Sequence, residues 1–325
     1  MRGSLMRRWT ANEHKEILSD NPRNADAAAA YTLAGRGSVS PQLVRYWRSI
    51  FEQNAGNMAA ADRMLAAQRN FIKPEPDDDI GTDFAFNLDE EAECILVIPD
   101  QHAPYQHPDT LPFLRTLRDT YDPDCVVNLG DETDNHALSF HDSDPNLDAA
   151  GAELEHAKVF LSELHDPFPH MLICHSNHGS MHFRRAKAHG IPVQMLKRYR
   201  DVLMPQKGGA PGWHWRFGWR IKTALGDVLF KHQAAGPIIG DAAHNQCNLV
   251  VGHNHGNYGI EYASSSKLLY WAMSCGCLVD KDAMAFAYGK HTKYKPIVGA
   301  AIIKNGLPIL VPMLLGEDGR WVGEL

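Results

Sequence analysis

The chain has 325 residues, with 32 Lys and Arg, 39 Asp and Glu, and a formal net charge of -7. This length exceeds one average domain. The charge argues against a protein that coats nucleic acid over its whole surface, although it is compatible with a local basic patch. Because no window is apolar enough for a membrane span and the first residues lack the apolar core of a signal peptide, we expect a soluble, cytoplasmic protein with no membrane partner. Six dispersed cysteines, mostly in strand-like runs, predict buried free thiols in a reducing compartment.

Residues 1 to 72 are basic and show helical patterns throughout. They carry ten Arg and Lys against six Asp and Glu. Capping-type residues precede the predicted helices, which span residues 12–18, 25–33, 41–53 and 58–71. We therefore predict a small all-helical domain over residues 1–72.

Residues 25 to 48 of this domain resemble a helix-turn-helix. A helix of small residues is followed by a Gly-containing turn and by a second helix with Pro41 at its first position. Leu43, Val44 and Trp47 are expected to face the core. The residues expected to project outward and contact DNA are Gln42, Arg45, Tyr46 and Arg48. We expect nucleic acid to bind through this domain, and a helical docking or dimerisation module is the alternative.

An acidic segment, residues 73–93, separates this domain from the rest of the chain. It contains nine acidic residues against one lysine, and two prolines. Such a composition is typical of a solvated linker. The remaining residues, 94–325, are predicted to form the catalytic domain.

Five short apolar runs in this catalytic domain each precede a polar cluster. The runs span residues 95–99, 125–129, 171–174, 228–230 and 249–251. The clusters are Asp100-Gln101-His102, Gly130-Asp131-Glu132-Thr133-Asp134, Asn177-His178, His232 and Gly252-His253-Asn254-His255. Buried strands that end in polar clusters place them along one edge of a sheet. Because the clusters supply enough oxygen and imidazole ligands for two divalent metal ions, the sequence indicates a metal-dependent hydrolase.

In this order the clusters resemble the signature of the calcineurin-like metallophosphoesterases, which is Asp-x-His, Gly-Asp-x-x-Asp, Gly-Asn-His, His and Gly-His-x-His. The resemblance covers residues 100 to 255, and five ordered blocks are far more specific than any one of them. It implies an α/β fold, a four-layer sandwich of two mixed β-sheets flanked by helices.

The resemblance also implies which residues bind metal, with Asp131 bridging two ions. The first site is completed by Asp100, His102 and His255, and the second by Asn177, His232 and His253. This donor set suits Mn, Fe, Zn or Ni more than Mg or Ca, and we expect two divalent ions per chain, with Mn as the first choice. Two ions about 3.5–4 Å apart neutralise phosphoryl oxygens and turn a bridging water into hydroxide.

By the same resemblance, His178 is the expected catalytic acid. It directly follows Asn177, so it should lie at the metal cleft and protonate the leaving oxygen without binding metal. Asp134 resembles the family carboxylate that hydrogen-bonds this histidine and orients it.

The chain departs from the family pattern at Asn135, where many family phosphatases have arginine. The missing guanidinium removes a bidentate clamp for a dianionic phosphomonoester, which favours a phosphodiester substrate. Arg184 or Arg185 is a possible substitute clamp, and these two residues with Asn135 are the substrate-binding candidates.

Residues 213–221 alternate like a strand, with aromatic side chains on one face and His214, Arg216 and Arg220 on the other. Such a segment can stack and clamp single-stranded bases. A packed sheet face is the favoured alternative, because large aromatic side chains usually lie in cores.

These observations favour a two-metal phosphodiesterase that acts on DNA or another nucleic acid. The alternatives are a phosphomonoesterase for nucleotides or phosphoproteins, a small cyclic-nucleotide phosphodiesterase, and a regulator with a vestigial metal site. The complete ligand set argues against the last. The sequence leaves the oligomeric state and the native metal open.

Overall fold

The computed structural model describes residues 11–36, 41, 44, 45, 47, 48, 86–139, 146–266, 268–283 and 295–325. The chain divides into two compact units, Met1–Pro76 and Asp77–Leu325. Among the described residues, no helix is long and apolar enough to cross a membrane.

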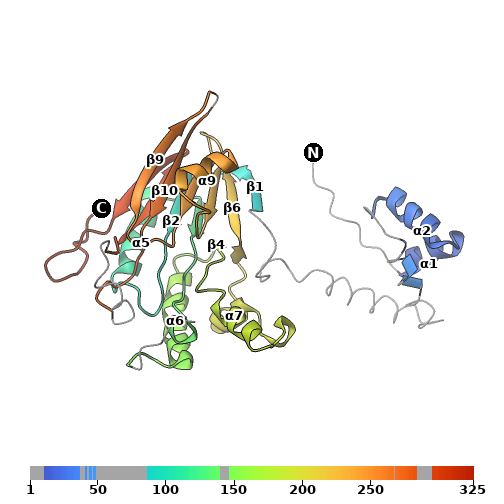
Figure 1. Cartoon of the computed structure of the whole chain (residues 1–325), viewed down its shortest axis with the longest axis horizontal. Coiled ribbons are helices and arrows are strands. Elements are labelled where there is room, and N and C mark those ends of the chain that lie inside the picture. The colour runs from blue at the N-terminus through green and yellow to red at the C-terminus, as the bar shows by residue number, and fades with distance from the viewer. Residues whose placement is uncertain are drawn as a thin grey trace. The chain divides into compact units, whose positions relative to one another are not determined.

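The N-terminal unit contains helices α1 (Ala11–Asp20) and α2 (Asn24–Tyr31), and α2 continues into a π-helical turn, η1 (Thr32–Arg36) (Figure 1). Aromatic contacts form its core. The His14 ring nitrogen Nδ1 lies 2.9 Å from the Tyr31 hydroxyl, and the rings of Tyr31 and Trp47 pack edge to face with centroids 4.7 Å apart. Val44 and Trp47 are buried, as predicted.

Of the four residues expected to contact DNA, Arg45 and Arg48 lie within the described part of the chain. Arg45 is exposed, as expected. Arg48 instead turns inward: its Nη1 donates to the Leu18 carbonyl at 2.9 Å, and its Nη2 donates to the Asn21 carbonyl. The last carbonyls of a helix lack partners within the helix, and this guanidinium satisfies those at the end of α1. Gln42, Tyr46 and the helix predicted over residues 58–71 lie outside the described residues.

The C-terminal unit contains two mixed six-stranded sheets. The first has the order β1 (Phe86–Glu91), β6 (Gly218–Lys222), β7 (Val228–Lys231), β8 (Asn248–Val251), β10 (Leu269–Cys275), β9 (Tyr258–Ser264). The second has the order β12 (Leu307–Pro312), β11 (Gly299–Lys304), β2 (Cys94–Ile98), β3 (Cys125–Asn128), β4 (Met171–Cys174), β5 (Trp213–Arg216).

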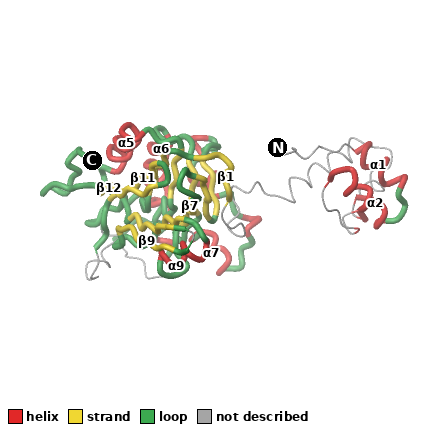
Figure 2. The backbone as a smooth tube through the Cα atoms, turned by 90° about the horizontal axis from the view of Figure 1, so that it is seen from above, coloured by secondary structure: helices red, strands yellow, loops and turns green. Residues whose placement is uncertain are grey.

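Helices cover the outer faces of both sheets. On the second sheet, α5 (Thr110–Tyr121) and α6 (Ala150–His165) bury Phe113, Leu117 and Leu161 against β2 and β4. On the first sheet, α9 (Ile238–Asn245) packs against β8 and β10. Residues of both sheets share one apolar core between them. Figure 2 shows these layers, with α5 and α6 on one side and α9 on the other. The predicted four-layer fold class is therefore confirmed.

The described part of this unit also contains shorter helices. They are η2 (His136–Leu138), α7 (Met181–Ala188), η3 (Val193–Met195), α8 (Tyr199–Leu203) and η4 (Pro205–Lys207). All six cysteines are free thiols, and five of them are buried, as predicted.

The five predicted strands are confirmed as β2, β3, β4, β7 and β8, but they do not share one sheet. The first three run parallel in the second sheet, and β7 and β8 run parallel in the first. An apolar run indicates a buried strand but does not specify which strand it pairs with, so the sequence did not show this partition.

Two predicted segments differ in their boundaries. The expected linker over residues 73–93 includes β1, which pairs in parallel with β6 at the edge of the first sheet. An edge strand tolerates charged residues, which explains how an acidic segment joins a sheet. The expected strand over residues 213–221 is split at Phe217 into β5 and β6, which belong to different sheets.

Candidate metal centre

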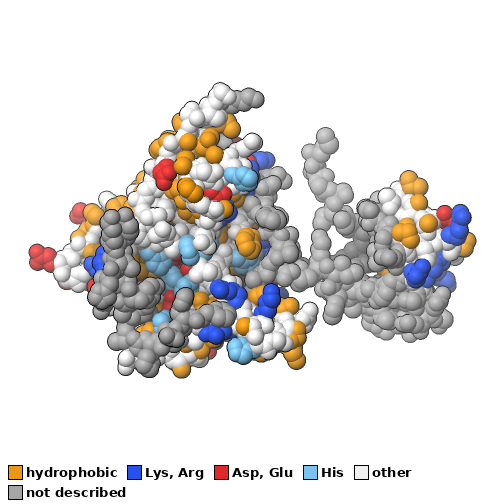
Figure 3. All heavy atoms as spheres, viewed as in Figure 1, with side chains coloured by type: hydrophobic (Ala, Val, Ile, Leu, Met, Phe, Trp, Pro, Cys, Tyr) orange, Lys and Arg blue, Asp and Glu red, His pale blue; other side chains and the backbone are white. Residues whose placement is uncertain are grey.

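The five polar clusters follow the carboxyl ends of β2, β3, β4, β7 and β8, and they come together at one place. On the face drawn in Figure 3, histidine and acidic side chains gather near the middle, with lysine and arginine side chains beside them. The seven predicted metal ligands all lie in this centre and form two groups.

In the first group, side-chain atoms of Asp100, His102 and His255 converge. The Nε2 atoms of His102 and His255 are 3.1 Å apart, and Asp100 Oδ2 lies 3.3 Å from His255 Nε2. Asp100 and His102 are buried, and His255 is partly buried. His255 is thus the solvent-accessible member of the group.

In the second group, three side chains converge in the same way. His232 Nε2 lies 2.7 Å from Asn177 Oδ1 and 3.2 Å from His253 Nδ1. The distance from His253 Nδ1 to Asn177 Oδ1 is 3.1 Å. An amide oxygen and two imidazole nitrogens therefore face a common point.

Asp131 lies between the two groups. Its Oδ2 atom is 3.4 Å from His102 Nε2 in the first group and 3.3 Å from His232 Nε2 in the second. The side chain is almost fully buried. A single carboxylate oxygen is therefore within reach of both sets of donor atoms.

The donor atoms fit divalent metal ions. Ligands about 2.1 Å from a tetrahedral centre are separated by roughly 3.4 Å, close to the spacing within both groups. Imidazole, carboxylate and amide donors suit transition-metal ions. In addition, the buried Asp100 Oδ1 has no hydrogen-bond partner among the residues that the structure describes. These clustered His and Asp side chains can hold metal ions.

Hydrogen bonds at the Nδ1 atoms orient two imidazole rings of the centre. His102 Nδ1 is 2.6 Å from Asp134 Oδ1, and His232 Nδ1 donates to the Leu129 carbonyl at 2.9 Å, so both rings direct Nε2 inward. Such partners fix the tautomer and orientation of metal-ligating histidines.

The centre is strongly electronegative. Burial on its own lowers the pKa of His232, but the nearby Asp131 and Asp100 carboxylates outweigh it and raise the pKa to about 9. For His102 too, burial lowers the pKa, whereas hydrogen bonds with Asp131 and Asp134 raise it well above its usual value. The carboxylates thus stabilise positive charge here, whether it is carried by protons or by metal ions.

Tight backbone geometry brings the ligands together. Gly130 has φ of +95°, and a Cβ atom there would lie 2.6 Å from the Cys174 carbonyl oxygen. A Cβ on Gly252 would lie 2.3 Å from Asp100 Oδ1. Glycine at these positions lets the next residue reach the centre: the His253 amide donates to Asp100 Oδ2 at 2.8 Å.

His178 lies at the edge of the centre, as expected, but Asp134 holds it differently from the prediction. The His178 ring donates from Nδ1 to the backbone carbonyl of Asp134. The Asp134 carboxylate is 3.4 Å from that nitrogen and makes its hydrogen bond with His102 instead. The His178 amide also donates to Asp131 Oδ1 at 3.1 Å. Asp134 therefore contacts both histidines, one through its backbone and one through its side chain.

The three substrate-binding candidates differ in their hydrogen bonds and in their exposure to solvent. Asn135 Nδ2 donates to the His178 carbonyl at 3.0 Å and to Thr133 Oγ1 at 2.9 Å. Arg185 donates to the carbonyl oxygens of Leu138 and Ser139, which ties α7 to η2. Both side chains thus hydrogen-bond to groups of the protein itself. Arg184 is exposed on α7.

Sequence reasoning missed several residues that support the site. Glu132 is buried behind the metal ligands, where its Oε1 accepts a hydrogen bond from Trp215 Nε1 at 3.1 Å, and burial raises its pKa. The carboxylate of Glu153 on α6 accepts the backbone amides of His136 and Ala137. Glu132 belongs to the cluster at residues 130–134, whereas no local sequence pattern connects Glu153 with His136 and Ala137.

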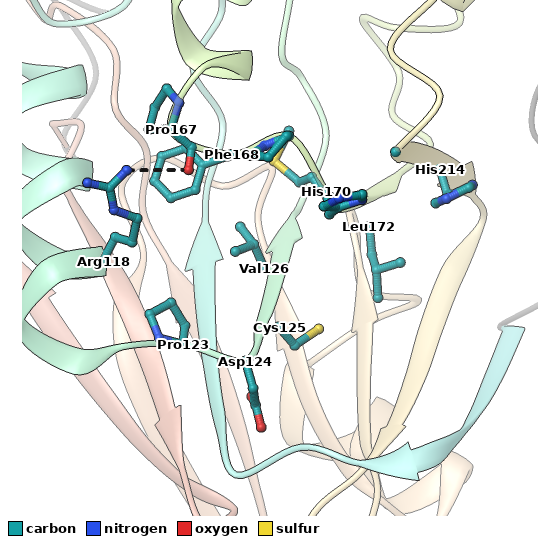
Figure 4. A pocket seen from close by; sticks show the side chains of 13 residues that line it. Arg118, Pro123, Asp124, Cys125, Val126, Pro167, Phe168, His170, Leu172 and His214 are labelled. Carbon is teal, nitrogen blue, oxygen red and sulfur yellow. Dashed lines mark hydrogen bonds between the residues drawn. The ribbon is translucent and has the colours of Figure 1, made fainter.

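A separate pocket of about 390 Å³ contains none of the predicted site residues. It lies at the amino ends of β3 and β4, where Val126 and Leu172 line it (Figure 4), whereas the ligands follow the carboxyl ends. Arg118 at its rim donates to the Pro167 carbonyl at 3.5 Å. The pocket is therefore distinct from the metal centre.

Comparisons with known proteins give only distant similarities. No protein-family model and no curated protein matches the chain. Among solved structures, Vps29 of Chaetomium thermophilum has a TM-score of 0.38 at 12% identity, covering 71% of this chain and 93% of its own. Vacuolar Protein Sorting 29 of Cryptosporidium parvum has a TM-score of 0.35 at 11% identity, covering 68% of this chain and 97% of its own. Similarities at this level assign neither a family nor an activity.

Replacing the shared carboxylate is expected to affect both groups of ligands. In Asp131→Asn, both ions should bind more weakly, because Asp131 Oδ2 lies within 3.4 Å of a ligand nitrogen in each group. His253→Ala should weaken one ion and retain the other. The measurement is the Mn²⁺ content per chain after dialysis. Asp227→Asn, a partly exposed carboxylate that pairs with Arg220, is the control. Equal metal loss in Asp131→Asn and His253→Ala would contradict a bridging role.

Proposed function

We propose that this protein is a two-metal phosphodiesterase of the calcineurin-like metallophosphoesterase type, that it uses Mn²⁺, and that it cleaves nucleic acid. One observation carries the proposal: the Oδ2 atom of Asp131 lies within 3.4 Å of a ligand nitrogen in each of two donor groups. Bound divalent ions there would supply positive charge for the phosphoryl oxygens and activate water as the nucleophile.

The residues of the chain assist this chemistry in two ways. Ions held by the two ligand groups would supply the positive charge that binds the phosphate. His178 has Nδ1 committed to the Asp134 carbonyl, so Nε2 is the atom that delivers a proton to the leaving oxygen. The Asn135 side chain keeps His178 in place by holding its carbonyl.

The hydrogen bonds that Arg185 makes within the protein support a diester substrate. A phosphomonoester carries a second negative charge, which a bidentate guanidinium stabilises best. Arg185 is committed to the carbonyls of Leu138 and Ser139 and cannot serve as this clamp in the same position. The exposed Arg184 keeps a phosphomonoesterase as the second candidate.

The charge distribution around the centre supports a polyanionic substrate. Residues 167–200, which include Asn177 and His178, contain six Lys and Arg and no Asp or Glu, in a chain of net charge -7. Arg184, Lys187 and Lys197 in this segment are exposed, and Figure 3 shows cationic side chains beside the histidines. Phosphate backbones bind such surfaces by releasing counterions.

The N-terminal unit is proposed to add affinity for DNA. Its net charge of about +4 follows from ten basic and six acidic residues in residues 1–72. Arg45 is exposed on the proposed recognition helix, whereas Arg48 stabilises the unit internally.

Removing the proposed acid should lower turnover without releasing metal. His178→Ala is expected to reduce kcat by roughly 10²–10⁴-fold on esters with alkyl leaving groups. The loss should be smaller with nitrophenol, which needs little protonation to leave. Metal content should stay at the wild-type value. The exposed His189 at the end of α7 provides a matched His→Ala control. Equal losses for both leaving groups would exclude His178 as the acid.

The diester preference is tested with paired small substrates. In the presence of Mn²⁺, kcat/KM for methyl nitrophenyl phosphate should exceed that for nitrophenyl phosphate. Cyclic nucleotides should be poorer substrates than single- or double-stranded DNA. A faster monoester reaction, lowered selectively by Arg184→Ala, would favour the phosphatase alternative.

The role of the N-terminal unit is tested by charge reversal in the full chain. Arg45→Glu should weaken DNA binding and reduce the slope of log K against log salt by about 0.9 for each lost phosphate contact. Hydrolysis of small diesters should not change. Lys15→Glu, an equal charge change at an exposed position of α1, is the control. Equal effects of the two variants would point to nonspecific electrostatics rather than a recognition helix.

A further inference from the structure

We propose that Phe217 stacks on a nucleobase next to the scissile phosphate, which makes the substrate single-stranded nucleic acid. This inference rests on the phosphodiesterase function proposed above. It starts from the one aromatic residue of the 213–221 segment that is not packed in a core.

The surroundings of Phe217 differ from those of its aromatic neighbours. Trp213, Trp215 and Trp219 are at most 3% exposed and belong to the two main cores. Phe217 is 55% exposed. Its ring contacts the His175 ring edge to face, with centroids 6.4 Å apart. The sheet core therefore accounts for the three tryptophans but does not require Phe217.

The topology places Phe217 between two metal-ligand segments. On one side, the His175 amide donates to the Arg216 carbonyl at 2.7 Å, and Asn177 follows two residues later. On the other side, Gly218 pairs with Lys231, and His232 is the next residue. Phe217 is the single residue that links β5 of one sheet to β6 of the other. The exposed Phe217 therefore lies beside the ends of β4 and β7, where the segments that carry Asn177 and His232 begin.

An aromatic ring beside a phosphate site fits one chemical class of ligand. A nucleobase stacks on an aromatic side chain irrespective of its sequence, while nearby cations follow the phosphates. The cations are present on α7 and just after it, with Lys187 and Lys197 exposed. Bases of a duplex are already stacked and paired, so a protein ring of this kind selects an unpaired strand.

The decisive experiment varies the ring and the base together. Wild-type protein with Mn²⁺ is given a single-stranded oligonucleotide and a strand of equal length built from abasic residues, and kcat/KM is measured for both. Wild type should prefer the strand with bases by roughly tenfold to a hundredfold. Phe217→Ala and Phe217→Leu should lose this preference and keep the rate on the abasic strand, whereas Phe217→Trp should retain it. Tyr262→Ala, which removes an aromatic side chain that is 58% exposed on β9, is the control.

The outcomes separate this inference from the function on which it rests. Cleavage of neither strand by wild type would overturn the nuclease proposal and the stacking inference together. If wild type cleaves both strands and Phe217→Ala leaves the ratio between them unchanged, only the stacking role is overturned. Retention of the preference by Phe217→Leu would overturn it as well, because an aliphatic side chain fills space but does not stack.

Discussion

The whole centre depends on one constraint: a single carboxylate oxygen of Asp131 must reach ligands that two different sheets supply. His102 follows β2 in the second sheet, and His232 follows β7 in the first. Their Nε2 atoms lie on either side of Asp131 Oδ2, at 3.4 and 3.3 Å. The apolar core between the sheets sets this separation, because close-packed interiors resist changes in volume. Packing of the two sheets therefore fixes the relative positions of the ligand residues.

Backbone strain is concentrated where this constraint acts. Four described residues at the centre, which are not glycine, adopt positive φ: His102, Asp131, Asn135 and His253. Each such conformation costs about 1–3 kcal/mol and persists only when surrounding contacts hold it. Here the contacts are hydrogen bonds: the His102 amide donates to the Asp131 carbonyl at 2.8 Å, and the His253 amide donates to Asp100 Oδ2. These hydrogen bonds thus hold the ligand residues in position.

The strands were predictable from the sequence, because apolar runs are local patterns, and the family resemblance supplied the candidate ligand residues that the structure brings together. The four-layer fold followed from the family resemblance. The partners of polar side chains were not predictable. Arg48 and Arg185 donate hydrogen bonds to backbone carbonyls, and Asn135 donates to the His178 carbonyl, at sequence separations of 27 to 47 residues. Whether a guanidinium faces solvent or a helix end depends on tertiary packing, which no local pattern records.

Arginine and asparagine side chains near the candidate metal centre hold backbone groups of the protein itself. Arg185 holds the Leu138 carbonyl and Asn135 holds the His178 carbonyl, so under the proposed function bound ions would meet only the phosphate, which every phosphoester shares. Discrimination would then come from groups around the centre, and the exposed ones include a phenyl ring at Phe217 and cations on and after α7. A ring selects bases and cations select a polyanion. Under the proposed function the combination favours a substrate with both, whereas Arg184 alone among these groups suits a small monoester.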